Sequence, residues 1–123
     1  MTVIRIERGW AGHFICADSC LFRRNTLLQK GRTRIVVSTV GGMRNNGKME
    51  TIGAFGRYYE TMAFKAQKQG PYWEADVTKQ LSFESPWSIC APTEKRLPDD
   101  VDSQADAMHE AVVAELTARL EEE

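Results

Sequence analysis

The C-terminal quarter of the chain carries the pattern that most restricts its fold. Met108, Val112, Leu116 and Leu120 are spaced four residues apart, which places them on one side of an α-helix. We therefore predict a helix over residues 102–121. A helix with a single apolar side needs an apolar surface to cover, so the rest of the chain must supply one.

The preceding residues predict a sheet. IVVSTV, within residues 34–40, is rich in β-branched side chains and favours a strand that pairs with residues 21–29 across the turn KGR. A second hairpin turns at KQGP, and the stretch from His13 to Ala17 is also β-prone. GGMRNNGK, residues 41–48, is typical of a loop.

The second hairpin has two distinct faces because side chains alternate along a strand. One face is predicted to hold Tyr58, Glu60, Met62 and Phe64, and the other Tyr59, Thr61, Ala63 and Lys65. On the returning strand, Trp73, Ala75, Val77 and Lys79 are predicted to share a face opposite Glu74, Asp76 and Thr78.

The expected fold is α+β, with an antiparallel sheet of four to six strands covered by the C-terminal helix. The 123 residues form one domain, strand-rich over 1–85, with a connector over 86–101 that contains three prolines. No apolar run is long enough to span a bilayer and none resembles a secretory signal, so we expect a cytoplasmic protein without a membrane partner. Three cysteines without an export signal favour reduced thiols.

Charge is sorted along the chain although the formal net charge is −1. Residues 1–48 hold nine Lys and Arg against two acidic residues, and residues 99–123 hold nine acidic residues against Arg119. Such a distribution indicates a basic binding face, an acidic interaction tail, or two surfaces that neutralise each other in the fold.

A histidine and two cysteines near the N-terminus raise the question of a metal site. His13, Cys16 and Cys20 have the spacing H-x2-C-x3-C, with Cys90 as a fourth candidate ligand. Structural zinc needs four converging ligands, and strand alternation would place His13 and Cys16 on opposite faces. We predict no metal and no cofactor, with the cysteines acting as small buried hydrophobic residues.

Catalytic signatures are weak. His13 or His109 could act as a base beside a thiol, but nothing in the sequence fixes either one there. Glu60, Glu74 and Asp76 could form a carboxylate pair, although alternating acids on a strand usually face solvent. Phosphate-loop, dinucleotide, GxSxG and HExxH motifs are absent. We expect a protein that is not an enzyme, and keep a small enzyme as an alternative.

Three sets of residues are candidate partner-binding surfaces. A basic hairpin over residues 21–34 could contact an acidic protein or a phosphate backbone. Aromatic residues often anchor protein interfaces, and the acidic side of the helix could mimic DNA. The candidates are Arg23, Arg24, Arg32 and Arg34 in the hairpin, the aromatic residues Tyr58, Tyr59, Tyr72 and Trp73, and Asp106 and Glu110 in the helix.

Four segments resemble a family of small proteins carried by phages and prophages of proteobacteria. They are ERGWAGHFICADSCLFRRNTLL, RIVVSTVG, RYYETMAF and MHEAVVAEL, which together cover about half of the chain. The resemblance implies a phage accessory protein of the anti-CRISPR type that blocks a type I surveillance complex.

The expected function is therefore stoichiometric inhibition of a host CRISPR–Cas effector by protein binding. We expect little binding to free nucleic acid, because the acidic C-terminal quarter repels phosphates. A small nucleic-acid-binding module that uses residues 21–34 is the main alternative, and homodimer formation is left open.

Overall fold

The computed structural model describes residues 2–8, 13, 20–45, 48–52, 56–90 and 98–123. Seven strands precede one helix in this part of the chain. They are β1 (Ile4–Glu7), β2 (Cys20–Lys30), β3 (Thr33–Asn45), β4 (Lys48–Met49), β5 (Arg57–Gln69), β6 (Tyr72–Leu81), β7 (Ser88–Cys90) and α1 (Pro98–Glu121).

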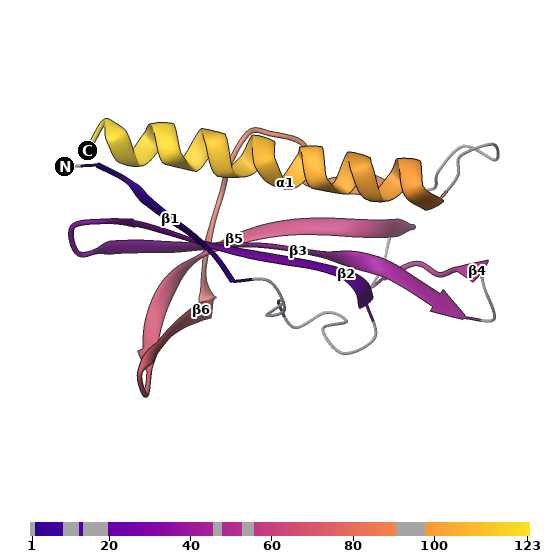
Figure 1. Ribbon diagram of the computed structural model, residues 1–123, viewed down its shortest axis with the longest axis horizontal. Helices are drawn as coiled ribbons and strands as arrows, with labels where there is room; N and C mark the ends of the chain where they lie inside the picture. Colours follow the sequence, from indigo (N-terminus) through magenta and orange to yellow (C-terminus); the bar gives the residue numbers. More distant parts are fainter. Residues whose placement is uncertain (1, 9–12, 14–19, 46–47, 53–55, 91–97) are drawn as a thin grey trace.

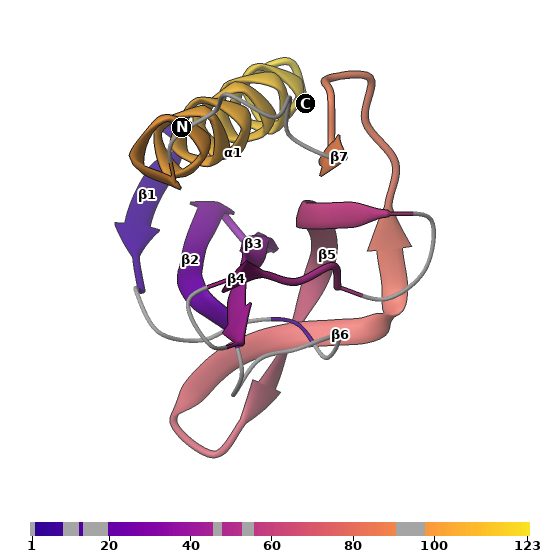
Figure 2. The same ribbon diagram turned by 90° about the vertical axis from the view of Figure 1, so that its right-hand side faces the viewer.

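The strands form a strongly curved antiparallel sheet in the order β1-β2-β3-β5-β6 (Figure 1). Two short strands lie off this path, β4 against β3 and β7 against β5. Viewed from the end, α1 lies along one side of the sheet and β6 curls away on the other (Figure 2). The predicted α+β fold, an antiparallel sheet with a C-terminal helix, is confirmed.

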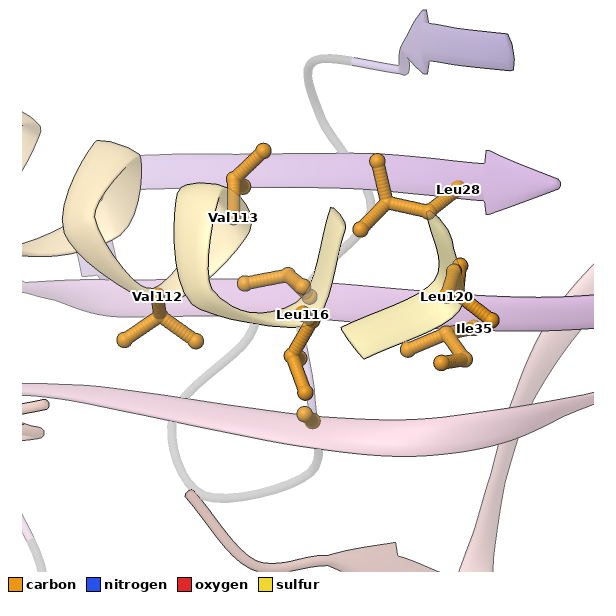
Figure 3. Packing of buried hydrophobic residues seen from close by; sticks show 8 residues of the cluster. Leu28, Ile35, Val112, Val113, Leu116 and Leu120 are labelled. Carbon is orange, nitrogen blue, oxygen red and sulfur yellow. The ribbon is translucent and has the colours of Figure 1, made fainter. Parts of the chain in front are cut away.

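The core between α1 and the sheet follows the predicted stripe. Val112, Leu116 and Leu120 are fully buried, and Met108 is nearly so. They pack onto apolar side chains of β2, β3 and β5, with Leu28 and Ile35 beneath the last turn of α1 (Figure 3). The helix begins at Pro98, four residues before the predicted start, and proline is well suited to a first helical turn.

The opposite face of the sheet is also buried. Because α1 covers only one face, other residues must cover this one. Cys20, Val40 and Ile52 form a small apolar cluster there, and His13 lies over Phe64 with ring centroids 6.1 Å apart. The sheet is therefore covered by α1 on one face, and on the other face His13 and Ile52 are among the described residues that pack onto it.

Two connecting segments differ from the prediction. β3 continues through Gly41 and Gly42 to Asn45, where a loop was expected. A Cβ atom at Gly41 would lie 2.5 Å from the Tyr59 ring and 2.4 Å from the Tyr58 carbonyl oxygen, so glycine lets the Tyr59 ring pack flat on the strand. The predicted connector over 86–101 contains β7 and the first turn of α1.

The faces of the second hairpin were predicted correctly for β5 but not for β6. Tyr59 and Ala63 pack towards α1, whereas Phe64 contacts His13 on the other face. In β6 the register against β5 shifts between Phe64 and Ala66, because residues 76–79 bulge out opposite one residue of β5. The bulge breaks the expected alternation, so β6 bends sharply.

Among the described residues, no helix combines the length and the apolar character that crossing a membrane requires.

The core position of Leu116 leads to a stability prediction. Leu116→Ala should lower the free energy of unfolding by about 2–4 kcal/mol, because it removes buried methyl groups and leaves a cavity. Leu21→Ala is the matched control, since the Leu21 side chain is 74% exposed, and it should change stability by less than about 0.5 kcal/mol. Chemical denaturation of both variants measures the difference, and equal costs would contradict the packing of α1 described above.

Candidate functional site

The predicted basic hairpin and the predicted acidic helix bind each other. Arg24 in β2 pairs with Glu110 and, more loosely, with Asp106 of α1, at nitrogen–oxygen distances of 2.9 Å and 3.4 Å. Arg5 donates two hydrogen bonds to Glu110, and Glu7 accepts from both arginines. Hydrogen bonds from Arg5 and then Arg24 lower the pKa of Glu110 to about 2. Three candidate binding residues are therefore engaged within the fold.

His109 extends this network into the core between α1 and the sheet. Its Nε2 lies 2.7 Å from Thr26 Oγ1, and its Nδ1 lies 2.7 Å from Thr39 Oγ1. Thr26 already donates its hydroxyl proton to Glu7, so Nε2 must carry the proton that Thr26 accepts. Thr39 then donates to Nδ1 and accepts from Thr61, 2.6 Å away. Every member of the chain is satisfied while the imidazole is neutral.

The electrostatics of His109 agree with this proton assignment. Burial of the ring is the largest cause that lowers its pKa, followed by the positive charge of Arg24, and the resulting pKa is about 4. The His109 side chain is fully buried, so it is not placed to act as a base beside an exposed thiol.

A second buried polar chain lies on the opposite face of the sheet. His13 Nδ1 is 2.9 Å from Ser38 Oγ, and His13 Nε2 is 2.9 Å from a carboxylate oxygen of Glu60. The other Glu60 oxygen is 3.5 Å from the guanidinium of Arg57. The Glu60 carboxylate can only accept, so Nε2 carries a proton that points at Glu60. In the neutral imidazole Nδ1 is then the acceptor, and the Ser38 hydroxyl donates to it while accepting from the backbone N–H of His13.

The Ser38–His13–Glu60 chain has the connectivity of a catalytic triad, but a substrate cannot reach its serine. A nucleophilic serine must reach the substrate, with donors placed to bind a developing oxyanion. Ser38 lies in the middle of β3 and is 1% exposed, and His13 is 2% exposed. A pocket of about 340 Å³ touches Glu60 and is otherwise lined by residues that include Arg57, Phe83 and Trp87. Ser38 is not among its described lining residues.

The cysteines depart from the expectation of reduced thiols. Cys20 is buried as predicted but is disulfide-bonded, whereas Cys90 is an exposed free thiol. Both ring nitrogens of His13 are hydrogen-bonded to protein side chains, so neither His13 nor Cys20 is free to bind a metal in this arrangement. The part of the prediction that concerns Cys16 and the strand over 14–17 lies outside the described residues.

The aromatic candidates separate into two places. Tyr59 is buried beneath α1, where its hydroxyl donates to Asp102, and Tyr58 is half-buried beside it. Tyr72, by contrast, is 66% exposed beside the turn of the β5–β6 hairpin. Among these four side chains Tyr72 is the exposed one, whereas Trp73, like Tyr58, is half-buried.

Trp73 joins the two hairpins. The guanidinium carbon of Arg34 lies 4.0 Å from the Trp73 ring centroid, and Arg34 also donates to the backbone oxygen of Arg32. Arg34 of β3 thus contacts Trp73 of β6, and Arg32 and Tyr72 lie close to them in the chain, at the turns of the β2–β3 and β5–β6 hairpins. The β5–β6 hairpin projects from the body of the molecule (Figure 1). We call Arg32, Arg34, Tyr72 and Trp73 the hairpin-end surface.

The remaining candidates do not join this surface. Arg23 is half-buried on the sheet face away from α1, since it alternates with Arg24 along β2. Glu74 pairs with Arg8 at 2.9 Å, and Asp76 accepts two hydrogen bonds from Thr78 within the β6 bulge. Glu60, Glu74 and Asp76 therefore each have a structural partner, and no carboxylate pair forms among them.

Sequence reasoning missed Ser38, Thr39 and Arg57. A signal was present for the first two, because polar Ser38 and Thr39 interrupt an otherwise apolar β-branched run that the pattern predicts to be buried. Buried hydroxyl groups need partners, so such an interruption indicates a polar network. The sequence gives no comparable signal for Arg57, because its partners Glu60 and Trp87 are set by the tertiary fold.

The fold and site together define an α+β protein with a buried polar chain on each face of its sheet and one projecting aromatic hairpin. Comparison with known proteins found no matching family model, curated protein or solved structure.

The low pKa of His109 makes stability depend on pH. The unfolded chain takes up a proton below the ordinary pKa of about 6.5, whereas folded His109 does so only near pH 4. The free energy of unfolding should therefore fall by about 1–3 kcal/mol as the pH is lowered from 7 to 4.5. The carboxylates Glu7 and Glu110 have an ordinary pKa of 4.5 in the unfolded chain, at the lower limit of this interval, so they add to the loss of stability only at its acidic end.

His109→Gln isolates this contribution, because it retains hydrogen bonding but has no ionisable group. Unfolding free energies measured between pH 7 and 4.5 should fall less steeply for this variant than for the wild type. Parallel profiles would show that His109 does not titrate differently in the two states.

The two described cysteines should differ in reactivity. Under native, non-reducing conditions a thiol reagent should modify Cys90 and leave Cys20 unmodified, since a disulfide sulfur is not a thiolate. Mass mapping of alkylated peptides before and after reduction tests this. Labelling of Cys20 without reductant would contradict the disulfide.

Proposed function

We propose that this protein acts by binding a protein partner, as a phage-type inhibitor of a host CRISPR–Cas type I surveillance complex. The site of action would be the host cytoplasm, and inhibition would be stoichiometric. Two lines support the proposal: the resemblance to phage and prophage proteins in four segments, and the presence of a projecting surface suited to protein contact.

The hairpin-end surface is the observation that carries the proposal. Tyr and Arg are the residues that most often dominate interface energies, and their contribution is largest when they are rigid before binding. Trp73 and Arg34 are held against each other, and the exposed residue Tyr72 directly precedes Trp73 in β6. A partner would therefore meet a preorganised aromatic and cationic surface.

Charge pairing within the fold argues against the alternative of a nucleic-acid-binding module over residues 21–34. Arg24 is engaged by Glu7 and Glu110, and Lys30 donates to backbone oxygens of Leu120 and Glu123 at the end of α1. Cations that already have partners release fewer counterions on binding a phosphate backbone. Binding to free nucleic acid should then be weak at physiological salt.

The disulfide at Cys20 provides a test of the proposed location in the host cytoplasm. Disulfides persist mainly in oxidising compartments and are rare where glutathione keeps thiols reduced. The thiol measurement above, repeated on protein taken directly from cells, tests whether the bond survives in the cytoplasm.

Inhibition should require the hairpin-end surface. A Tyr72→Ala/Arg32→Glu double variant removes an exposed aromatic anchor and reverses an exposed charge while leaving the Arg34–Trp73 stack intact. We expect affinity for the purified effector complex to fall by about thirtyfold or more, with an unchanged unfolding curve. Leu21→Ala, which also removes an exposed apolar side chain, should bind as the wild type does.

Titration in a target-cleavage assay tests the stoichiometry. A surface inhibitor should give full inhibition near one molecule per complex. Inhibition at far lower ratios would instead require turnover, and would make the Ser38–His13–Glu60 chain the first site to mutate. A double variant that inhibits fully would exclude the hairpin-end surface as the contact.

A further inference from the structure

A second pocket opens beneath the β5–β6 hairpin, on the sheet face away from α1. Its volume is about 420 Å³, which lies within the range of small-molecule sites. Buried His13 and Asn25 form its floor, and exposed Gln69, Tyr72 and Val77 form its rim. We call it the hairpin pocket.

Asn25, one of the residues that line the hairpin pocket, carries an unsatisfied hydrogen-bond acceptor. Asn25 is 3% exposed, and its side-chain oxygen Oδ1 has no hydrogen-bond partner among the described residues. A buried acceptor without a donor is costly and rare in folded proteins. The ring nitrogens of His13 are already occupied by Ser38 and Glu60, so Asn25 is the floor residue with hydrogen-bonding capacity to offer.

The rim favours a flat and uncharged ligand. The exposed ring of Tyr72 offers a stacking surface, and Val77 and Ala75 add apolar contact. Glu74 also lines the pocket, but its charge is balanced by Arg8 at 2.9 Å. The described lining therefore carries no uncompensated charge to attract an ionic ligand.

A carboxamide and an aromatic ring can together bind adenine. The carboxamide can accept from the exocyclic amine and donate to the neighbouring ring nitrogen, and the base stacks on the ring. We propose that the hairpin pocket binds an adenine base, held by Asn25 at the floor and by Tyr72 at the rim. The base would come from a free nucleoside or nucleotide, or from an unpaired position in a single strand.

Adenine binding would be a separate property from inhibition of an effector complex. The two proposals involve different residues except for Tyr72, which they share. The contacts involve no phosphate, so affinity should change little with salt concentration, in contrast to binding driven by phosphates.

Titration of the full chain with adenosine and inosine, followed by NMR or calorimetry, tests the proposal. Inosine carries a carbonyl oxygen where adenosine has the exocyclic amine. Its affinity should therefore be lower than that of adenosine by a factor of about ten or more. Equal binding of the two nucleosides, or no binding of adenosine, would overturn the assignment of the pocket.

Two variants test the residues separately. Asn25→Leu should abolish the preference for adenosine, and its unfolding curve shows whether the fold is kept. Tyr72→Ala lies at an exposed position that does not endanger folding, and it should weaken adenosine binding while Leu21→Ala leaves it unchanged. Retained affinity in Tyr72→Ala would overturn the stacking contact, whatever the outcome for Asn25→Leu.

A short single-stranded oligoadenylate distinguishes the two sources of the base. Tighter binding of the oligomer than of adenosine would assign an unpaired base in a strand, and equal binding would assign a free nucleoside. Arg32→Glu alone separates the two proposals, because Arg32 belongs to the hairpin-end surface and is not among the described residues that line the hairpin pocket. This variant should weaken binding to the effector complex and leave adenosine binding unchanged.

Discussion

The packing of α1 against the curved sheet is the interaction on which the other features depend. Leu116, Leu120 and Val112 bury their side chains on β2, β3 and β5, and this contact brings the acidic helix over the basic strands. Once the helix is docked, Arg24 and Arg5 meet Glu110, and His109 enters the polar chain of Thr26 and Thr39. The apolar stripe therefore determines which charges remain at the surface.

Both faces of the sheet bury polar groups, and both networks are closed by hydrogen bonds. On the helix side the protons can be assigned from Thr61 through Thr39 and neutral His109 to Thr26 and Glu7. On the other side the same logic links Ser38, His13 and Glu60. Satisfied buried networks favour a single arrangement of the elements, because any slip of register would leave a buried donor or acceptor without its partner.

The candidate site could be predicted only in part. The aromatic candidates Tyr58, Tyr59, Tyr72 and Trp73 were named from residue type, and the structure buries Tyr59, which packs on Gly41 beneath the helix. The uneven distribution of charge along the chain allowed three interpretations. One of them, that two oppositely charged surfaces neutralise each other, matches the ion pairs between β2 and α1. The choice between these alternatives required distances between β2 and α1, which are 82 residues apart at Arg24 and Asp106.

The sequence by itself determined the class of fold. Four-residue spacing identified the buried side of the helix, and β-branched runs with glycine turns identified the central strands, because both signals arise from local geometry. Tertiary structure alone decided that Asn25, His13 and Tyr72 line one pocket and that Arg34 stacks on Trp73. Those contacts depend on the bulge in β6 and the curl of the sheet, which follow from packing among distant residues and leave no periodic pattern in the chain.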